Sequence, residues 1–151
     1  MEIPDLRGPL PPDSVATLVD RDAICRLPKL YALGVDLRDD AMVRSVFTPD
    51  AFVRGMLGDF PIDEYVPMLI EGVRVYEATM HNITNQWATV DGDEASVWSA
   101  AVALHFEERG NGRVDMAMGV HYRDRLVRTD HGWLVSARQT EQLWTRGPFP
   151  R

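Results

Sequence analysis

Residues 94–108 read EASVWSAAVALHFEE, and this stretch decides the fold class of the chain. It is rich in apolar and aromatic residues, as expected for a long β-strand. Successive side chains of a strand point to opposite faces, so His105 shares one face with Val97, Ser99, Ala101 and Ala103. The small side chains on that face leave room beside His105, either for a ligand or for packed helices.

Three more stretches have the same character: residues 81–90, 113–128 and 133–145. Turn sequences separate these stretches, as Asp-Gly-Asp does at 91–93. We therefore expect an antiparallel meander of long strands. Gly119 lies in the middle of one of them and indicates a bulge or a strong bend, because glycine inside a strand often marks one.

The residues before the meander follow a helical pattern. Asp13 or Ser14 can cap a helix that begins near Val15. Apolar residues then recur at helical spacing as far as Tyr31, which predicts one or two amphipathic helices. Pro28 should kink or interrupt this helix, because proline lacks an N–H group and clashes with the preceding turn.

Shorter elements connect this helical segment to the meander. A short helix at 41–47 should end at the Thr-Pro-Asp sequence of 48–50. Residues 51–60 contain two glycines and predict a bent or short strand. A third helix is expected at 61–75, with acidic residues that suit its N-terminus.

Helices followed by an antiparallel meander predict an α+β domain. We expect the N-terminal helices to pack in the concave face of a strongly curved, mixed but mainly antiparallel sheet, as a cone-shaped α+β barrel with an internal hollow. Residues 1–12 should form an N-terminal arm, residues 13–146 a single domain, and residues 147–151 a C-terminal tail.

The composition excludes several classes of protein. The chain has 16 Lys and Arg against 23 Asp and Glu, and this net charge of −7 argues against nucleic-acid binding. No stretch approaches the roughly 20 apolar residues that a membrane helix needs, and residues 1–12 do not resemble a signal peptide. The single cysteine, Cys25, excludes an internal disulfide and fits a reducing, cytoplasmic location.

The sequence also lacks the common cofactor and metal motifs. It has no phosphate-binding loop, dinucleotide fingerprint or nucleophile elbow. Its histidines are not paired at the spacing of metal ligands. We therefore expect a protein that works without a cofactor and without a metal ion.

Histidine is the first candidate for acid–base chemistry, because its unperturbed pKa lies near neutrality. The chain has four histidines. His131 falls in a predicted turn and should be solvated, and His121 falls on the outward side of its strand. His81 and His105 remain as candidates, although either could be a hydrogen-bonded polar residue without a catalytic role.

Asp36 lies at the end of the first helical segment. It can act as a cap or as the charge partner of Arg38. Alternatively, it can orient a histidine and stabilise the imidazolium, as the carboxylate of a catalytic triad does. Tyr31 lies about 140° away around an ideal helix, so the two side chains converge only if the helix ends or bends near Gly34.

Five short sequences carry a resemblance to a known family. They are YALGVDLRD at 31–39, VFTPDA at 46–51, TMHN at 79–82, VDGDEA at 90–95 and YRDRLVRTDHGW at 122–133. Together they resemble the SnoaL-like branch of the nuclear-transport-factor-two-like superfamily, over roughly residues 14–145. The resemblance implies the curved-sheet fold and makes residues 13–146 a single SnoaL-like domain.

The resemblance also implies the site residues. Scytalone dehydratase, bile-acid dehydratase and hexachlorocyclohexane dehydrochlorinase have an Asp and a His at positions that correspond to Asp36 and His81. A second histidine of scytalone dehydratase corresponds to His105, and a tyrosine of bile-acid dehydratase corresponds to Tyr31. The late arginine of bile-acid dehydratase has Arg138 as its nearest counterpart.

Further residues concern the substrate. The predicted substrate-binding residues are Arg138, Tyr122, Val35 and Met118. Two tyrosines of scytalone dehydratase align roughly with Val35 and Gly55, which argues against scytalone itself as the substrate. The dehydrochlorinase has a cationic residue where this chain has Tyr31, which argues against dehalogenation.

The resulting hypothesis is a cofactor-free lyase that acts on a small hydrophobic, cyclic substrate. His81 would remove a proton next to a carbonyl group, Asp36 would hold the imidazole, and His105 or Tyr31 would donate to the departing hydroxyl or to a developing oxyanion. The alternatives are an isomerase or polyketide cyclase that uses the same pair, and a non-catalytic small-molecule binding module. A homo-oligomer, either a trimer or a dimer, is expected because the long strands carry apolar residues on both faces.

Overall fold

The computed structural model describes residue 8, residues 12–109 and residues 112–148. The helices are α1 (Val15–Leu37), α2 (Asp40–Arg44) and α3 (Ile62–Arg74). The strands are β1 (Phe47–Arg54), β2 (Phe60–Pro61), β3 (Ala78–Asp91), β4 (Glu94–Arg109), β5 (Gly112–Thr129) and β6 (Gly132–Arg146). Most of the predicted arm and of the predicted tail, namely residues 1–7, 9–11 and 149–151, lie outside the described residues.

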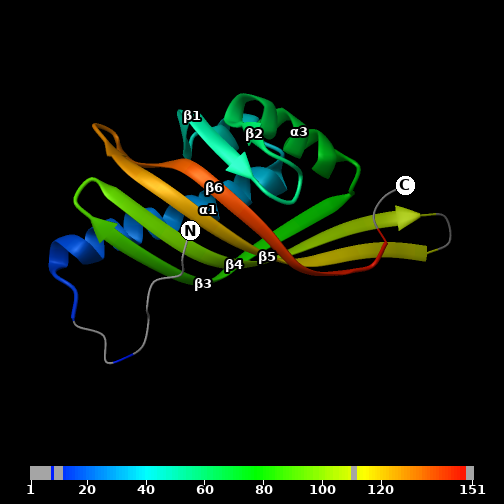
Figure 1. Ribbon diagram of the computed structural model, residues 1–151. Coiled ribbons are helices and arrows are strands. Elements are labelled where there is room, and N and C mark those ends of the chain that lie inside the picture. Colours follow the sequence, from blue (N-terminus) through cyan, green and yellow to red (C-terminus); the bar gives the residue numbers. More distant parts are fainter. Residues whose placement is uncertain (1–7, 9–11, 110–111, 149–151) are drawn as a thin grey trace.

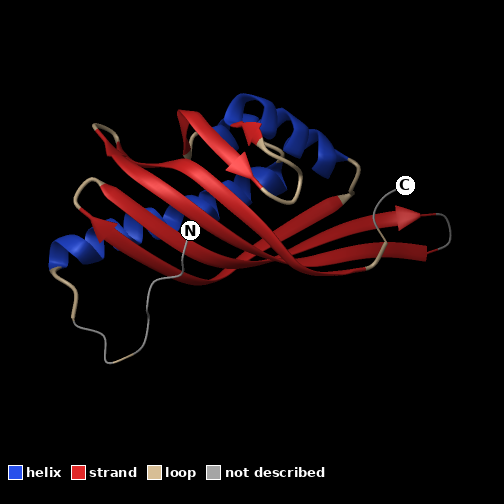
Figure 2. Cartoon of the chain, viewed as in Figure 1, coloured by secondary structure: helices blue, strands red, loops and turns tan. Residues whose placement is uncertain are grey.

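The strands form a six-stranded sheet in the order β2-β1-β6-β5-β4-β3. β1 and β6 are parallel, and the other neighbouring strands are antiparallel. Figure 2 shows the helices gathered on one side of this twisted sheet. The α+β prediction is therefore confirmed. The sheet itself stays open, because β2 and β3 are its two edges and the helices cover the concave face.

α1 is a single helix that starts and ends with clear capping contacts. The Ser14 side chain accepts a hydrogen bond from the backbone N–H of Thr17 at 3.1 Å, as an N-cap residue does. The helix continues through Pro28, so the possible interruption there does not occur. It ends at Arg38, whose backbone adopts the left-handed conformation with φ of 57°. No helix in the described part of the chain combines the length and apolarity needed to cross a membrane.

The segment around Pro49 differs from the expectation. The short helix α2 ends at Arg44, and β1 already starts at Phe47, so the Thr-Pro-Asp sequence lies inside a strand. The pairing of β1 with β6 is irregular between Phe47 and Phe52. Proline is tolerated at such an irregularity because the ladder does not use its missing N–H group. The third predicted helix is confirmed as α3.

The predicted meander is confirmed as β3 to β6. The pairing of β5 with β6 shifts register between Gly119 and Val120, as expected for a bulge. A Cβ atom on Gly119 would lie 2.2 Å from the indole nitrogen of Trp144. The absence of a side chain at Gly119 therefore leaves room for the indole ring that packs on it.

The layers leave a hollow between the helices and the sheet. Figure 1 shows α1 and α3 on the concave side, with β4 and β5 extending beyond them. The face of β4 that was predicted to carry His105 is buried, with Val97 and Ser99 fully buried and Ala103 nearly so. These small residues leave the space in which the candidate site lies.

Candidate active site

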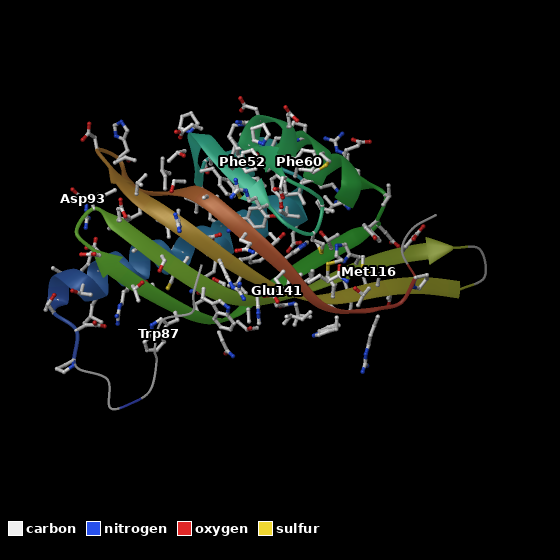
Figure 3. All side chains as sticks on the ribbon, viewed as in Figure 1. Phe52, Phe60, Trp87, Asp93, Met116 and Glu141 are labelled. Atoms are coloured by element: carbon white, nitrogen blue, oxygen red, sulfur yellow. The ribbon has the colours of Figure 1, made fainter. Side chains whose placement is uncertain are left out.

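A cavity of about 290 Å³ lies between the helices and the concave face of the sheet. This volume is close to the lower end of the range for small-molecule sites. Its lining residues come from α1, from α3, from the loops on either side of β2 and α3, and from the inner face of the sheet. They are Tyr31, Met56, Leu57, Tyr65, Met68, Leu69, Gly72, Val73, Tyr76, His81, Ala103, His105, Met116, Met118, Val120, Tyr122 and Thr140. Met116 is labelled in Figure 3. The lining is mostly apolar, with imidazole and phenol groups as its polar features.

His81 and Asp36 are in direct contact at this cavity. Nδ1 of His81 lies 2.7 Å from Oδ1 of Asp36. The backbone N–H of His81 donates to Oδ2 of Asp36 at 2.9 Å, and the Thr79 hydroxyl donates to Oδ1 at 2.9 Å. The carboxylate is thus held by three donors, and His81 itself supplies two of them. With Nδ1 directed at Asp36, Nε2 is the ring nitrogen left for other contacts.

Arg38 fixes the end of α1 against the start of β3. Its guanidinium donates to the carbonyl oxygens of Tyr76 at 2.8 Å and Glu77 at 3.2 Å. These carbonyls directly precede β3, which carries His81. Arg38 therefore positions Asp36 through the backbone instead of acting as its charge partner.

The environment of Asp36 keeps the carboxylate ionised. Partial burial alone would raise its pKa, but the hydrogen bonds from the ring and backbone N–H of His81, together with Thr79, hold the pKa below its ordinary value. Near neutral pH the carboxylate can accept Nδ1–H of a neutral imidazole and can stabilise an imidazolium.

His105 lies next to His81 on the same face of the sheet. The two imidazole rings meet edge to face, with centroids 5.5 Å apart, and the Tyr76 ring packs 4.6 Å from the His105 ring. Burial, reinforced by the nearby His81, lowers the pKa of His105 to about 4. His105 is therefore neutral near pH 7. Its Nδ1 is buried and has no hydrogen-bond partner among the described residues.

Tyr31 forms a hydrogen bond with Tyr65, a residue that the sequence analysis did not identify. Its hydroxyl lies 2.8 Å from the hydroxyl of Tyr65 on α3, and both residues line the cavity. Tyr31 and Asp36 do not converge, because α1 continues past both of them. Gly34 permits close packing instead of a bend, since a Cβ atom there would lie 2.8 Å from a methyl group of Val43.

Arg138 lies behind the cavity wall and is fully buried. It forms a bidentate ion pair with Asp124, with two N–H···O distances of 2.7 Å. Its guanidinium carbon lies 4.2 Å from the centroid of the Tyr31 ring and 4.6 Å from that of Tyr122. Arg138 therefore packs against the rings of Tyr31 and Tyr122, and these two residues, not Arg138, line the cavity.

The other predicted substrate-binding residues divide into two groups. Tyr122 and Met118 line the cavity. Val35 is fully buried in the core and is not among the described residues that line the cavity. Its neighbour Asp36 turns toward β3, and consecutive residues of a helix cannot share that direction.

The sequence contains patterns that place Tyr65 and Asp124 on the inward faces of their elements. Tyr65, Leu69 and Val73 recur at the spacing of one helix face, and all three line the cavity. Asp124 continues the alternating inward series that includes Tyr122 on β5. In both cases the periodicity alone indicates an inward side chain.

The other two histidines lie outside the cavity. His121 lies on the opposite face of β5 from Met118, with its ring 4.6 Å from Trp98, and His131 is exposed in the turn before β6. Among the described residues, no group of three or more His, Cys, Asp or Glu side chains is arranged to hold a metal ion.

Comparison with known proteins relates this chain to one family. The family model described as SnoaL-like domain matches residues 16–139. Uncharacterized proteins of Mycobacterium tuberculosis and Mycobacterium bovis are 31% identical over 132 residues, which cover 83% of this chain and 86% of each relative.

Solved structures agree on the fold. A protein from Kribbella flavida has a TM-score of 0.76 at 25% identity, covering 85% of this chain and 94% of its own. A protein of Novosphingobium aromaticivorans, provisionally assigned as a scytalone dehydratase, has a TM-score of 0.76 at 24% identity, with 89% and 91% covered. A type 2 hexachlorocyclohexane dehydrochlorinase has a TM-score of 0.74 at 23% identity, with 87% and 90% covered. The last two identities establish a shared fold and nothing about the reaction.

Proposed function

This chain belongs to the SnoaL-like domain family, and on that premise we propose that it is a cofactor-free lyase of the dehydratase type. The observation that carries the proposal is the contact of 2.7 Å between His81 and Asp36 at the wall of an apolar cavity. A histidine that is oriented by a carboxylate, with its second nitrogen available, has the arrangement of a general base.

His81 performs the proton transfer in this mechanism. Nδ1–H donates to Asp36, so Nε2 carries the lone pair that removes a proton from the carbon next to a carbonyl group. Asp36 stabilises the imidazolium that forms. The electron pair of the broken C–H bond forms the new double bond, and the hydroxyl group leaves as water together with the proton that His81 removed. A positioned base of this kind contributes about 10²- to 10⁴-fold in rate.

Neutral hydrogen-bond groups in the cavity assist the step. His105, or the hydrogen-bonded pair of Tyr31 and Tyr65, donates to the departing hydroxyl or to the carbonyl oxygen as negative charge develops on it. Because Met116, Met118 and Val120 line the same cavity, such a hydrogen bond acts in an environment of low polarity, where it is stronger than in water. This environment favours a small hydrophobic, cyclic substrate that carries few oxygen atoms.

Screening with cyclic β-hydroxyketones tests the proposal. The wild-type protein should convert one of them to a product that is lighter by about 18 Da, the mass of one water, whereas an isomerase or cyclase would leave the mass unchanged. The His81→Ala and Asp36→Asn variants should lose turnover of that substrate by about 10²-fold or more. Full activity in either folded variant would contradict the mechanism. Normal ligand binding without any turnover in the wild type would favour the binding-module alternative.

We also propose that the protein forms a homo-oligomer. Met80, Leu143 and Trp144 on the strands are exposed in the single chain, and exposed apolar side chains on a sheet are commonly covered by a partner. Light scattering after size-exclusion chromatography would distinguish a monomer, a dimer and a trimer. The cytoplasmic location inferred from Cys25 stays a prediction.

A further inference from the structure

Two phenol groups from different helices meet at the cavity wall. The hydroxyl groups of Tyr31 on α1 and Tyr65 on α3 lie 2.8 Å apart. The two residues are only 3% and 4% exposed. In such a pair one hydroxyl donates and the other accepts, so one O–H group remains free to bind a third oxygen atom. The direction of the shared hydrogen bond decides which tyrosine holds that free O–H group.

Arg138 makes this pair asymmetric. Its guanidinium carbon lies 4.2 Å from the centroid of the Tyr31 ring, and the two 2.7 Å hydrogen bonds to Asp124 fix its position. A buried cation attracts the oxygen end of a nearby hydroxyl dipole and repels its hydrogen. The Tyr31 hydrogen is therefore directed away from Arg138, which leaves the Tyr65 oxygen as its acceptor.

We propose that Tyr31 donates its hydrogen bond to Tyr65, and that Tyr65 presents the free O–H group to an oxygen atom of the ligand. Tyr65 is then the residue that touches the ligand, and Tyr31 is a positioning residue held by Arg138 and Asp124. The ligand class is an apolar molecule with a carbonyl, enolate or phenolate oxygen, because these oxygens accept a hydrogen bond and can carry negative charge.

Both phenols are kept in their protonated form. Burial raises the pKa of Tyr65 to about 12, and the hydrogen bond with Tyr31 limits the rise. Burial raises the pKa of Tyr31 well above its ordinary value of 10, the neighbouring Tyr65 adds to the rise, and Arg138 opposes it. Both phenols therefore keep their protons near neutral pH, as hydrogen-bond donors must.

The inference rests on the proposed function in one respect, since the oxygen bound by Tyr65 is the one on which charge develops after His81 removes a proton. Its test does not require turnover. The probe is 4-nitrophenol, whose phenolate absorbs visible light, titrated into the full chain and into the Tyr65→Phe, Tyr31→Phe and Thr84→Val variants. The two tyrosine substitutions each remove one hydroxyl from the cavity and keep the ring. Thr84→Val is the control, because the Thr84 hydroxyl is exposed on β3 and donates to the carbonyl oxygen of Ala100 outside the cavity.

Tyr65→Phe should weaken binding of the phenolate about 10- to 100-fold, because it removes a hydrogen bond to a charged oxygen. Tyr31→Phe should weaken binding about 3- to 10-fold, since Tyr65 keeps its own O–H group but loses the group that orients it. The control Thr84→Val should stay within about 2-fold. The pKa of the bound probe should also lie below that of the free probe, return toward it in Tyr65→Phe, and return only in part in Tyr31→Phe.

A larger loss in Tyr31→Phe than in Tyr65→Phe would overturn the assignment, even if the protein proves to be a lyase. An equal loss in all three variants, or no binding by the wild type, would overturn it as well. The predicted order of losses in a protein without turnover would support Tyr65 and contradict the lyase. If Tyr65→Phe does not fold, 13C-tyrosine labelling of the wild type gives the same comparison, because the Cζ signal of Tyr65 should shift more than that of Tyr31 on probe binding.

Discussion

His81 binds the carboxylate of Asp36 through two of its own groups, with Nδ1 at 2.7 Å from Oδ1 and the backbone N–H at 2.9 Å from Oδ2. The backbone hydrogen bond fixes the carboxylate relative to β3, and the ring then meets an acceptor whose position is already set. The pair is therefore rigid without depending on a long side chain, which is the condition for a base that is ready before substrate binds.

The first prediction concerns the tautomer of His81. In the wild type at neutral pH, 15N NMR should show a protonated Nδ1 and an unprotonated Nε2 on any neutral His81 ring. The reason is that Nδ1 is the ring nitrogen that lies against the ionised carboxylate of Asp36. Asp36→Asn should reduce the preference for this tautomer and lower turnover by about 10²- to 10⁴-fold. An unchanged tautomer together with unchanged turnover would exclude the orienting role.

Asp39→Asn is the matched control for this prediction. Asp39 lies close to Asp36 in the chain and caps α2 by accepting a hydrogen bond from Met42 at 2.9 Å. Asparagine is as good an N-cap residue as aspartate. The control variant should therefore keep the stability, the His81 tautomer and the turnover of the wild type.

The second prediction uses the buried neutral His105. Its pKa is about 4 in the folded protein, against an ordinary value of 6.5. Between these values the unfolded chain binds a proton that the folded chain does not, so the stability must fall as the pH falls from 6.5 toward 4. The full difference corresponds to about 3 kcal/mol. Urea unfolding at about pH 7 and about pH 4.5 should show most of this loss in the wild type.

His105→Gln should remove this pH dependence, and His131→Gln should preserve it. Glutamine does not titrate, so the first variant should lose less stability on acidification, whatever its stability at neutral pH. His131 is exposed in a turn outside the cavity, so its replacement leaves the surroundings of His105 unchanged. The lowered pKa of Asp36 adds its own loss only below its ordinary value of 3.8, so it acts outside this range. Equal acid sensitivity in both variants would argue against a neutral, buried His105.

How far the sequence predicts the structure depends on how many positions along the chain separate the residues in contact. The four long strands follow from their apolar and aromatic composition and from the turn sequences between them. The inward face of β4 follows from the alternation in residues 94–108, because burial on one side imposes a period of two. The contact of Asp36 with His81 joins residues 45 positions apart. Each residue could be named as a candidate, but their meeting depends on how Arg38 fixes the end of α1, and no local pattern reports that.

Arg138 shows a second limit of the sequence. A strand arginine is usually exposed, and only its ion pair with Asp124 makes full burial acceptable. Its predicted contact with the substrate was based on resemblance, whereas its observed contacts are with Asp124 and the rings of Tyr31 and Tyr122. The alternation along β5 could have placed Asp124 inside the domain, and that would have named a partner for the arginine.

The third prediction concerns this buried pair. Arg138→Met should lower the free energy of unfolding by about 3–5 kcal/mol, because it leaves the Asp124 carboxylate buried without its partner. Adding Asp124→Leu to that variant should recover part of the loss, since no uncompensated charge then remains. Urea unfolding of the two single variants and the double variant measures the coupling. Additive losses would show that the two side chains do not depend on each other.

The last prediction contrasts two helical glycines. A Cβ atom on Gly34 of α1 would lie 2.8 Å from a methyl group of Val43 and 2.9 Å from its backbone nitrogen, whereas a Cβ atom on Gly72 of α3 would meet nothing within 4 Å. Gly34→Ala must push α1 away from α2 and should cost about 1–3 kcal/mol. Gly72→Ala should instead stabilise the protein by about 0.5–1 kcal/mol, as alanine does in a helix interior.

Because Asp36 follows Gly34 in the last turn of α1, the Gly34→Ala variant should also disturb the His81 tautomer measured by 15N NMR. Val43→Ala added to Gly34→Ala should restore only part of the stability, since the backbone nitrogen stays in the way. A Gly34→Ala variant as stable as Gly72→Ala would mean that α1 and α2 are packed more loosely than these distances require.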